Sequence, residues 1–121
     1  MPNKAGGMET DLPEEVAGKM KALLREYNAG EEKTFEDILD FHVKFERIHP
    51  FQDGNGRVGR LIMFKECLKH GIVPFIIEDN LKVLYYRGLK EWNKEEGYLT
   101  DTCLAAQDKY KEYLDYFRIK Y

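Results

Sequence analysis

One stretch of twelve residues, 49–60, combines several side chains whose types and spacing could do chemistry together. It reads HPFQDGNGRVGR and brings together a histidine, an aspartate, two arginines and three glycines. An imidazole can act as a general base near neutral pH, a carboxylate can hold a hard cation, and guanidinium groups match the geometry of phosphate oxygens. The make-up of this segment therefore indicates a site that handles phosphate groups.

The two arginines of the segment, Arg57 and Arg60, lie one turn apart at the start of a predicted helix. The positive end of the helix dipole disfavours cations there, so an anion is expected beside them. Gly54, Asn55 and Gly56 come just before and allow backbone amides to converge on such an anion. These residues predict a phosphate cradle, and the competing interpretation is a tight turn between two core helices.

Three further side chains of the segment have expected roles. Asp53 precedes the glycines and is expected to bind magnesium, while the competing interpretation makes it a turn residue that caps the next helix. His49 ends the preceding helix and is expected to be the general base for an incoming hydroxyl. Phe51 is expected to turn inward and anchor the loop. The other histidines, His42 and His70, are interpreted as ordinary helix residues whose charge is favourable near a helix C-terminus.

Apolar residues recur at helical spacing in most of the chain, which predicts an all-α fold. Thr34 and Asp37 resemble a capping pair, and Pro50 ends a helix because it disfavours the helical conformation of the residue before it. The segment 75–77 is too short to assign as a strand and is expected to be a connector. The expected helices span about residues 13–28, 35–48, 55–70, 79–92 and 100–117.

The bulk properties of the chain favour one compact domain, because 121 residues are too few for two ordinary cores. A net charge of -3 argues against a basic face for nucleic acid. Cys67 and Cys103 fit neither a disulfide framework nor a zinc site and are expected to be buried thiols in a reducing compartment. No apolar run approaches about 20 residues and no signal-like leader is present, so a cytoplasmic protein without a membrane partner is expected.

The segment 49–60 matches every fixed position of the motif HxFx(D/E)GNGRxxR, which is typical of the Fic (filamentation induced by cAMP) family. The matching residues are His49, Phe51, Asp53, Gly54, Asn55, Gly56, Arg57 and Arg60. The chain resembles the family over about residues 8–118. This resemblance implies an all-α, Fic-type helical core at 13–121. It also implies that residues 1–12 are a loop or a remnant of the family's flap hairpin, so the chain is expected to be N-terminally shortened.

The resemblance implies a protein adenylyltransferase that transfers AMP from ATP to a Tyr, Thr or Ser hydroxyl of a target protein, with Mg²⁺ as cofactor. In that family pattern His49 is the catalytic base and Asp53 is the metal ligand. The nucleotide phosphates are held by Gly54, Asn55, Gly56, Arg57 and Arg60, of which the last orients the terminal phosphates. On the fourth helix, Tyr85, Tyr86 and Leu89 suit either a base pocket or plain core.

Two other interpretations stay open: a nucleotide-binding Fic remnant without catalysis, and a Fic enzyme that uses another nucleotide or removes the modification. The family's self-inhibitory pattern, (S/T)xxxE(G/N), is not matched, because Pro13 interrupts the segment from Thr10 to Glu14. Inhibition, if there is any, is therefore expected to come from residues missing from this chain or from a separate inhibitory protein. Apolar surface on the helices at 13–28 and 100–117 is expected to drive self-association into a homo-oligomer.

Overall fold

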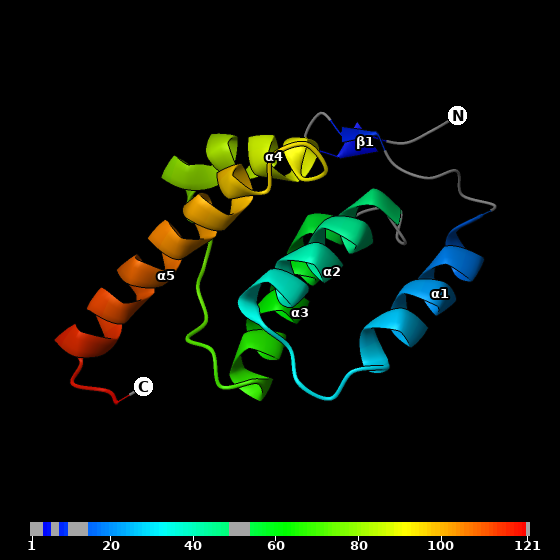
Figure 1. The fold of residues 1–121 in the computed structure, drawn as a ribbon. Coiled ribbons are helices and arrows are strands. Elements are labelled where there is room, and N and C mark those ends of the chain that lie inside the picture. The colour runs from blue at the N-terminus through cyan, green and yellow to red at the C-terminus, as the bar shows by residue number, and fades with distance from the viewer. Residues whose placement is uncertain (1–3, 6–7, 10–14, 49–53, 121) are drawn as a thin grey trace. The chain divides into compact units, whose positions relative to one another are not determined.

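The computed structural model describes residues 4–5, 8–9, 15–48 and 54–120, and these residues form an all-α core as the sequence predicts (Figure 1). Two two-residue strands precede the helices and pair antiparallel, with Lys4 opposite Glu9 and Ala5 opposite Met8. The elements are β1 Lys4–Ala5, β2 Met8–Glu9, α1 Val16–Asn28, α2 Phe35–Ile48, α3 Asn55–Lys69, the 3-10 helix η2 Asp79–Leu81, α4 Lys82–Glu91 and α5 Gly97–Tyr116.

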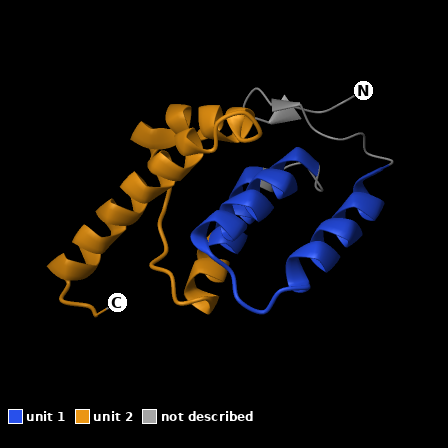
Figure 2. Ribbon diagram, in the orientation of Figure 1, with its two compact units in different colours: residues 1–63 blue, residues 64–121 orange. Residues whose placement is uncertain are grey.

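The chain divides into two compact units, Met1–Met63 and Phe64–Tyr121, and the boundary falls within α3 (Figure 2). In the first unit α1 packs against α2 around a buried apolar cluster. The buried members of that cluster are Leu23, Phe41, Phe45 and Ile48, and Val16, Met20, Tyr27, Val58 and Ile62 pack against it. Full burial of such a side chain contributes roughly 1.5–3 kcal/mol, so this cluster is what holds the three helices of the unit together.

The start of α2 is set by the capping pair that the sequence predicts. The Thr34 backbone N–H donates to Asp37 Oδ2 at 3.0 Å, and the Asp37 backbone N–H donates to Thr34 Oγ1 at 3.1 Å. The hydrogen bond from the Thr34 backbone is the main reason why the pKa of Asp37 is lowered. Two orphan amides are thereby satisfied, which fixes where the helix begins.

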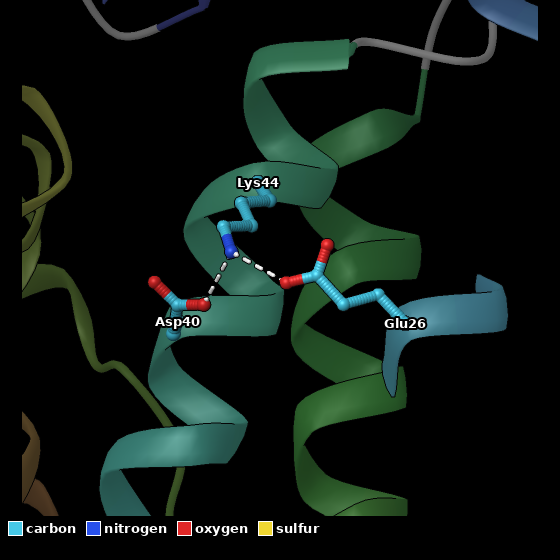
Figure 3. A network of polar contacts seen from close by, with 3 residues as sticks. All are labelled: Glu26, Asp40 and Lys44. Atoms are coloured by element: carbon cyan, nitrogen blue, oxygen red, sulfur yellow. Dashed lines mark hydrogen bonds and ion pairs between the residues drawn. The ribbon is translucent and has the colours of Figure 1, made fainter. Parts of the chain in front are cut away.

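A charged contact between two helices adds to the α1–α2 packing (Figure 3). Lys44 Nζ lies 2.8 Å from Asp40 Oδ2 on its own helix and 3.5 Å from Glu26 Oε1 on α1. The hydrogen bond with Asp40 is the main cause of the raised pKa of Lys44. All three side chains are largely exposed, so the network orients the helices more than it stabilises them.

The end of α3 is a Schellman motif built on Gly71. Gly71 has a φ of 71°, the left-handed conformation that glycine adopts without strain. The Ile72 N–H donates to the Cys67 carbonyl at 2.8 Å, and the Gly71 N–H donates to the Leu68 carbonyl at 3.3 Å. These bonds satisfy carbonyls at the helix end, as expected for a glycine in that position.

The second unit is organised by the crossing of α4 and α5. A Cβ at Gly88 would lie 2.6 Å from Leu99 Cα, so only glycine permits this approach. Tyr85 and Leu89 are buried, which supports the plain-core interpretation for them. Cys103 and Cys67 are buried free thiols as predicted, and burial raises the pKa of both, that of Cys67 to about 11.

The helix boundaries differ from the prediction at three places. The region expected as one helix at 79–92 begins as the 3-10 turn η2 before α4. The last helix begins at Gly97 rather than near residue 100, and the Gly97 N–H donates to Glu95 Oε1 at 3.0 Å. The first helix begins at Val16, and its expected start at Pro13 lies outside the described residues. Residues 75–77 form a connector, as predicted.

None of the helices in the described part of the chain combines the length and the apolar character needed to cross a membrane.

Candidate functional site

The motif residues divide into two groups in the structure. His49, Phe51 and Asp53 lie outside the described residues. The remaining five lie at the start of α3 or in its first turns: Gly54, Asn55, Gly56, Arg57 and Arg60. The predicted phosphate cradle therefore coincides with the N-terminus of a helix of fifteen residues.

Gly54 forms the entry to this helix. Its φ is 74°, a conformation that L side chains rarely adopt, and no heavy atom would lie within 4 Å of an added Cβ. Glycine is therefore required here by the backbone and not by crowding. The Gly54 carbonyl accepts a hydrogen bond of 2.9 Å from the Val58 N–H, so helical bonding starts at this residue. The first amides of α3 consequently have no partner within the helix and suit an anion.

The side chain of Arg60 folds back along α3 toward that N-terminus. A Cβ at Gly56 would lie 2.9 Å from Arg60 Nη1 and 3.6 Å from Arg60 Cζ. The guanidinium group therefore lies against the first turn of its own helix, in space that any larger residue at position 56 would fill. Arg57 is exposed and Arg60 is half-buried. Both cations sit where the helix dipole is positive, which favours a site for negative charge.

Gly59 lies where α3 comes close to side chains of α2. A Cβ at Gly59 would collide with Glu46 Oε1, and it would lie 3.1 Å from Phe45 Cδ1 and 3.2 Å from His42 Cε1. Glycine at this position lets the polar side chains of His42 and Glu46 on α2 lie directly beneath the first turns of α3. Gly59 occupies a variable position of the motif and thus serves helix packing.

The polar pair beneath Gly59 is deeply buried. The side chains of His42 and Glu46 are 1% and 3% exposed, and His42 Nε2 lies 4.0 Å from Glu46 Oε1. Burial lowers the pKa of His42 to about 4, against the opposing effect of a hydrogen bond with the Gly59 backbone. Burial raises the pKa of Glu46 to about 7, and the charge of Arg60 lowers it in part. Burial therefore favours the neutral form of both groups.

These findings correct the interpretation of His42 as a favourable charge near a helix C-terminus. His42 lies in the middle of α2 and is buried and neutral at physiological pH. His70, by contrast, directly follows α3, and its Nε2 lies 3.6 Å from Glu66 Oε1. Glu46 was not singled out by the sequence reasoning. A signal for it does exist, because His42 and Glu46 stand four residues apart on a helix face that is otherwise apolar.

The described residues contain no cluster of side chains that could hold a metal ion by itself. Within 4–5, 8–9, 15–48 and 54–120, no group of three or more His, Cys, Asp or Glu side chains could hold a metal ion. The donors at the start of α3 are amide N–H and guanidinium groups, which suit phosphate oxygens and not a cation. The chemistry of these groups therefore suits an anion.

Comparison with protein families identifies the family to which this motif belongs. Residues 2–67 match the family model described as Fic/DOC family, and the match includes the whole motif. This chain belongs to the Fic/DOC family. Membership follows because the matched region covers more than half of the 121 residues.

Several curated proteins are similar to this Fic chain. A probable protein adenylyltransferase of Aquifex aeolicus is 39% identical over 69 residues, which are 54% of this chain and 20% of that protein. The protein adenylyltransferase Fic of Drosophila melanogaster is 34% identical over 92 residues, which are 74% of this chain and 19% of that protein. The protein of the same name in Drosophila virilis is 43% identical over 53 residues, or 44% and 11%. The chain spans about a fifth or less of these relatives.

Proposed function

We propose that this Fic chain transfers AMP from ATP to a Tyr, Thr or Ser hydroxyl of a target protein. The observation that carries the proposal is the anion site at the start of α3, where Gly54 with φ 74° opens the helix and Arg60 folds back over Gly56. The names of the relatives, which are protein adenylyltransferases, support AMP as the transferred group.

In this proposal the N-terminus of α3 binds the phosphates. The backbone amides of Gly54, Asn55, Gly56 and Arg57 donate to phosphate oxygens, and the helix dipole favours their negative charge. The guanidinium of Arg60 reaches the terminal phosphates from its place over the first turn. These donors are fixed before the nucleotide arrives, and such preorganised charge stabilisation is commonly the largest contribution to catalysis.

The metal requirement rests on one carboxylate. Mg²⁺ in nucleotide sites is commonly held by one or two carboxylates together with the substrate phosphates, which suits Asp53 as its single protein ligand. When bound, the ion would neutralise charge on the phosphate oxygens. A full protein cage is not needed for this role.

The chemical step is an in-line displacement at the α-phosphorus. His49 takes the proton of the acceptor hydroxyl, the oxygen forms a bond to the α-phosphorus, and the bond to the bridging oxygen of the β-phosphate breaks. Pyrophosphate leaves with the electron pair of that bond, and AMP stays on the target. The protein supplies position, a base and positive charge, and no covalent intermediate with the enzyme is required.

The proposal is tested by incubating the purified chain with Mg²⁺, cell lysate and one α-labelled nucleotide at a time: ATP, UTP, GTP or, with label in its choline phosphate, CDP-choline. We expect label from ATP to be transferred to protein, and we expect no transfer by the His49→Ala variant. Label from another nucleotide would move the proposal to that substrate. Binding of ATP without transfer would favour the alternative of a non-catalytic nucleotide-binding Fic remnant. Loss of AMP from protein that already carries it would indicate removal of the modification.

A further inference from the structure

Glu46 is a buried carboxylic acid to which the proposed reaction gives no role. It is 2% exposed, and its Oε1 accepts no hydrogen bond from the described residues. Burying a carboxylate is costly unless its charge is used, and a neutral residue of the same size would fill the space at lower cost. The position of Glu46 therefore calls for a functional explanation.

Two observations connect this carboxylate with Arg60. Gly59, which contacts Glu46, and Gly56, which contacts the Arg60 guanidinium, are three residues apart on α3. Positions i and i+3 share one helix face, so both side chains occupy the same face of α3. The positive charge of Arg60 also lowers the pKa of Glu46, as expected for an opposite charge nearby.

We propose that Glu46 is a positioning residue for Arg60, whose guanidinium charge it attracts from beneath Gly59 in the first turns of α3. This inference rests on the proposed function only in its consequence, which is that Arg60 is held ready for the nucleotide phosphates. His42 on α2 and Arg60 on α3 are the titratable or charged groups known to face Glu46 within the described residues. Burial lowers the pKa of His42 to about 4, so His42 is neutral in the pH range in which Glu46 is ionised.

A nucleotide-binding experiment tests the consequence. We expect Glu46→Gln, which keeps the shape and removes the charge, to weaken binding of ATP with Mg²⁺ by about tenfold at pH 8 in calorimetry. The double variant Glu46→Gln/Arg60→Ala should bind no more weakly than Arg60→Ala alone, because Glu46 acts through Arg60. Glu66→Gln is the matched control: Glu66 is also buried, but it lies on α3 beside His70, and the affinity should not change. Unchanged affinity of Glu46→Gln, or additive losses in the double variant, would overturn the proposal.

The pH dependence separates positioning from a merely structural role. Glu46 loses its charge as the pH falls through about 7, so the affinity ratio of parent to Glu46→Gln should shrink from pH 8 to pH 6. Titration of the nucleotide and of other groups affects both proteins and cancels in the ratio. A ratio that stays constant over this range would contradict the proposal.

A measurement without nucleotide keeps the proposal independent of the reaction. In the chain labelled with ¹³C in its glutamate carboxyl groups, the NMR titration midpoint of Glu46 should rise in Arg60→Ala, because the guanidinium charge lowers it in the parent. Arg60→Lys should keep the midpoint near that of the parent. An unchanged midpoint in Arg60→Ala would overturn the positioning role even if ATP binds, whereas failure of the parent to bind any nucleotide would overturn the proposed function alone.

Discussion

At the scale of single residues, His42 and Glu46 make the stability of the fold depend on pH in opposite directions. The pKa of His42 falls from 6.5 to about 4 on folding, so the unfolded chain binds a proton first and stability is lost as the pH falls from about 6.5 to 4. The pKa of Glu46 rises from 4.5 to about 7, so stability is lost as the pH rises from about 4.5 to 7. Each effect is worth about 3 kcal/mol, and the two largely offset each other.

Replacing either residue should therefore reveal how the other makes the free energy of unfolding depend on pH. In Glu46→Gln we expect the free energy of unfolding to fall by about 3 kcal/mol from pH 6.5 to pH 4, because only His42 remains. In His42→Gln it should fall by a similar amount from pH 4.5 to pH 7. Urea unfolding of parent and variants across this range measures the effect, and the two opposite slopes serve as each other's control. A variant profile as flat as that of the parent would show that the groups are not held as the structure has them.

The catalytic assignment of His49 is also a prediction at this scale. His49→Ala should bind ATP as well as the parent but lose transfer by at least about 100-fold, because a general base acts on the acceptor hydroxyl and not on the nucleotide. Calorimetry and transfer of labelled AMP measure the two properties separately. Arg60→Ala is the contrasting variant, since it should lose affinity as well. Transfer by His49→Ala at the rate of the parent would mean that another group is the base.

Asp53 should act through the cation. In Asp53→Ala we expect the gain in ATP affinity on adding Mg²⁺ to shrink by about tenfold, while binding without Mg²⁺ changes little. Calorimetry with and without the metal gives both values for variant and parent. Equal effects of Mg²⁺ on the two proteins would leave Asp53 as a turn residue that caps α3.

The positions of Gly54, Gly56 and Arg60 at the start of α3 could be predicted from the sequence because the signals are local, while the roles of the motif residues stay predictions. Gly54 needs only its own backbone conformation, and Gly56 and Arg60 are one turn apart on the same helix. Glu46 could not be assigned in this way, because its importance depends on which residue of α3 lies against it. Nothing local in the sequence states that α3 approaches α2 at Gly59.

At the scale of helices, the α2–α3 approach predicts a contrast between two glycines. Gly59→Ala should destabilise the chain by about 1–3 kcal/mol, since its methyl group would displace Glu46, His42 and Phe45. Gly18→Ala in α1 meets nothing within 4 Å and should stabilise by about 0.5–1 kcal/mol through helix propensity. Thermal or urea unfolding of both variants gives the comparison. If Gly59→Ala were as stable as Gly18→Ala, the close approach of the two helices would not exist.

Helix boundaries were predictable where side chains or glycines close the hydrogen bonding locally. Thr34 with Asp37 and the left-handed Gly71 are such signals, and α2 and α3 have the predicted bounds within one residue. The start of α5 was not predicted from the sequence for two reasons. Gly97 has low helix propensity, and the side chain of the N-cap residue Glu96 makes no capping hydrogen bond. Its first amide is satisfied instead by the Glu95 carboxylate.

At the scale of the whole molecule, the division into two units within α3 was not evident from the sequence. Val58 and Ile62, in the first half of α3, pack against the α1–α2 cluster. The rings of Phe64 and of Tyr110 on α5 meet edge to face, with their centroids 5.8 Å apart. One helix therefore serves two cores, and its apolar residues point in several directions. No single amphipathic stripe reveals this arrangement, because a stripe indicates one buried face only.

The final prediction concerns the stability of the whole chain when it is loaded with nucleotide. A ligand that binds only the folded state stabilises it by RT ln(1 + [L]/Kd), so ATP with Mg²⁺ at 100 times its Kd should add about 2.7 kcal/mol. At about 4 °C per kcal/mol, which suits a domain between the small and the large size classes, that is a rise in Tm of roughly 11 °C, and it should grow with the logarithm of concentration. Arg60→Ala and Glu46→Gln should each need more nucleotide for the same rise, whereas Glu66→Gln should follow the parent. Differential scanning fluorimetry over a nucleotide series tests all four proteins together. A rise that is equal in parent and Arg60→Ala would show that Arg60 does not bind the nucleotide, which would contradict its part in the proposed reaction and the consequence proposed for Glu46.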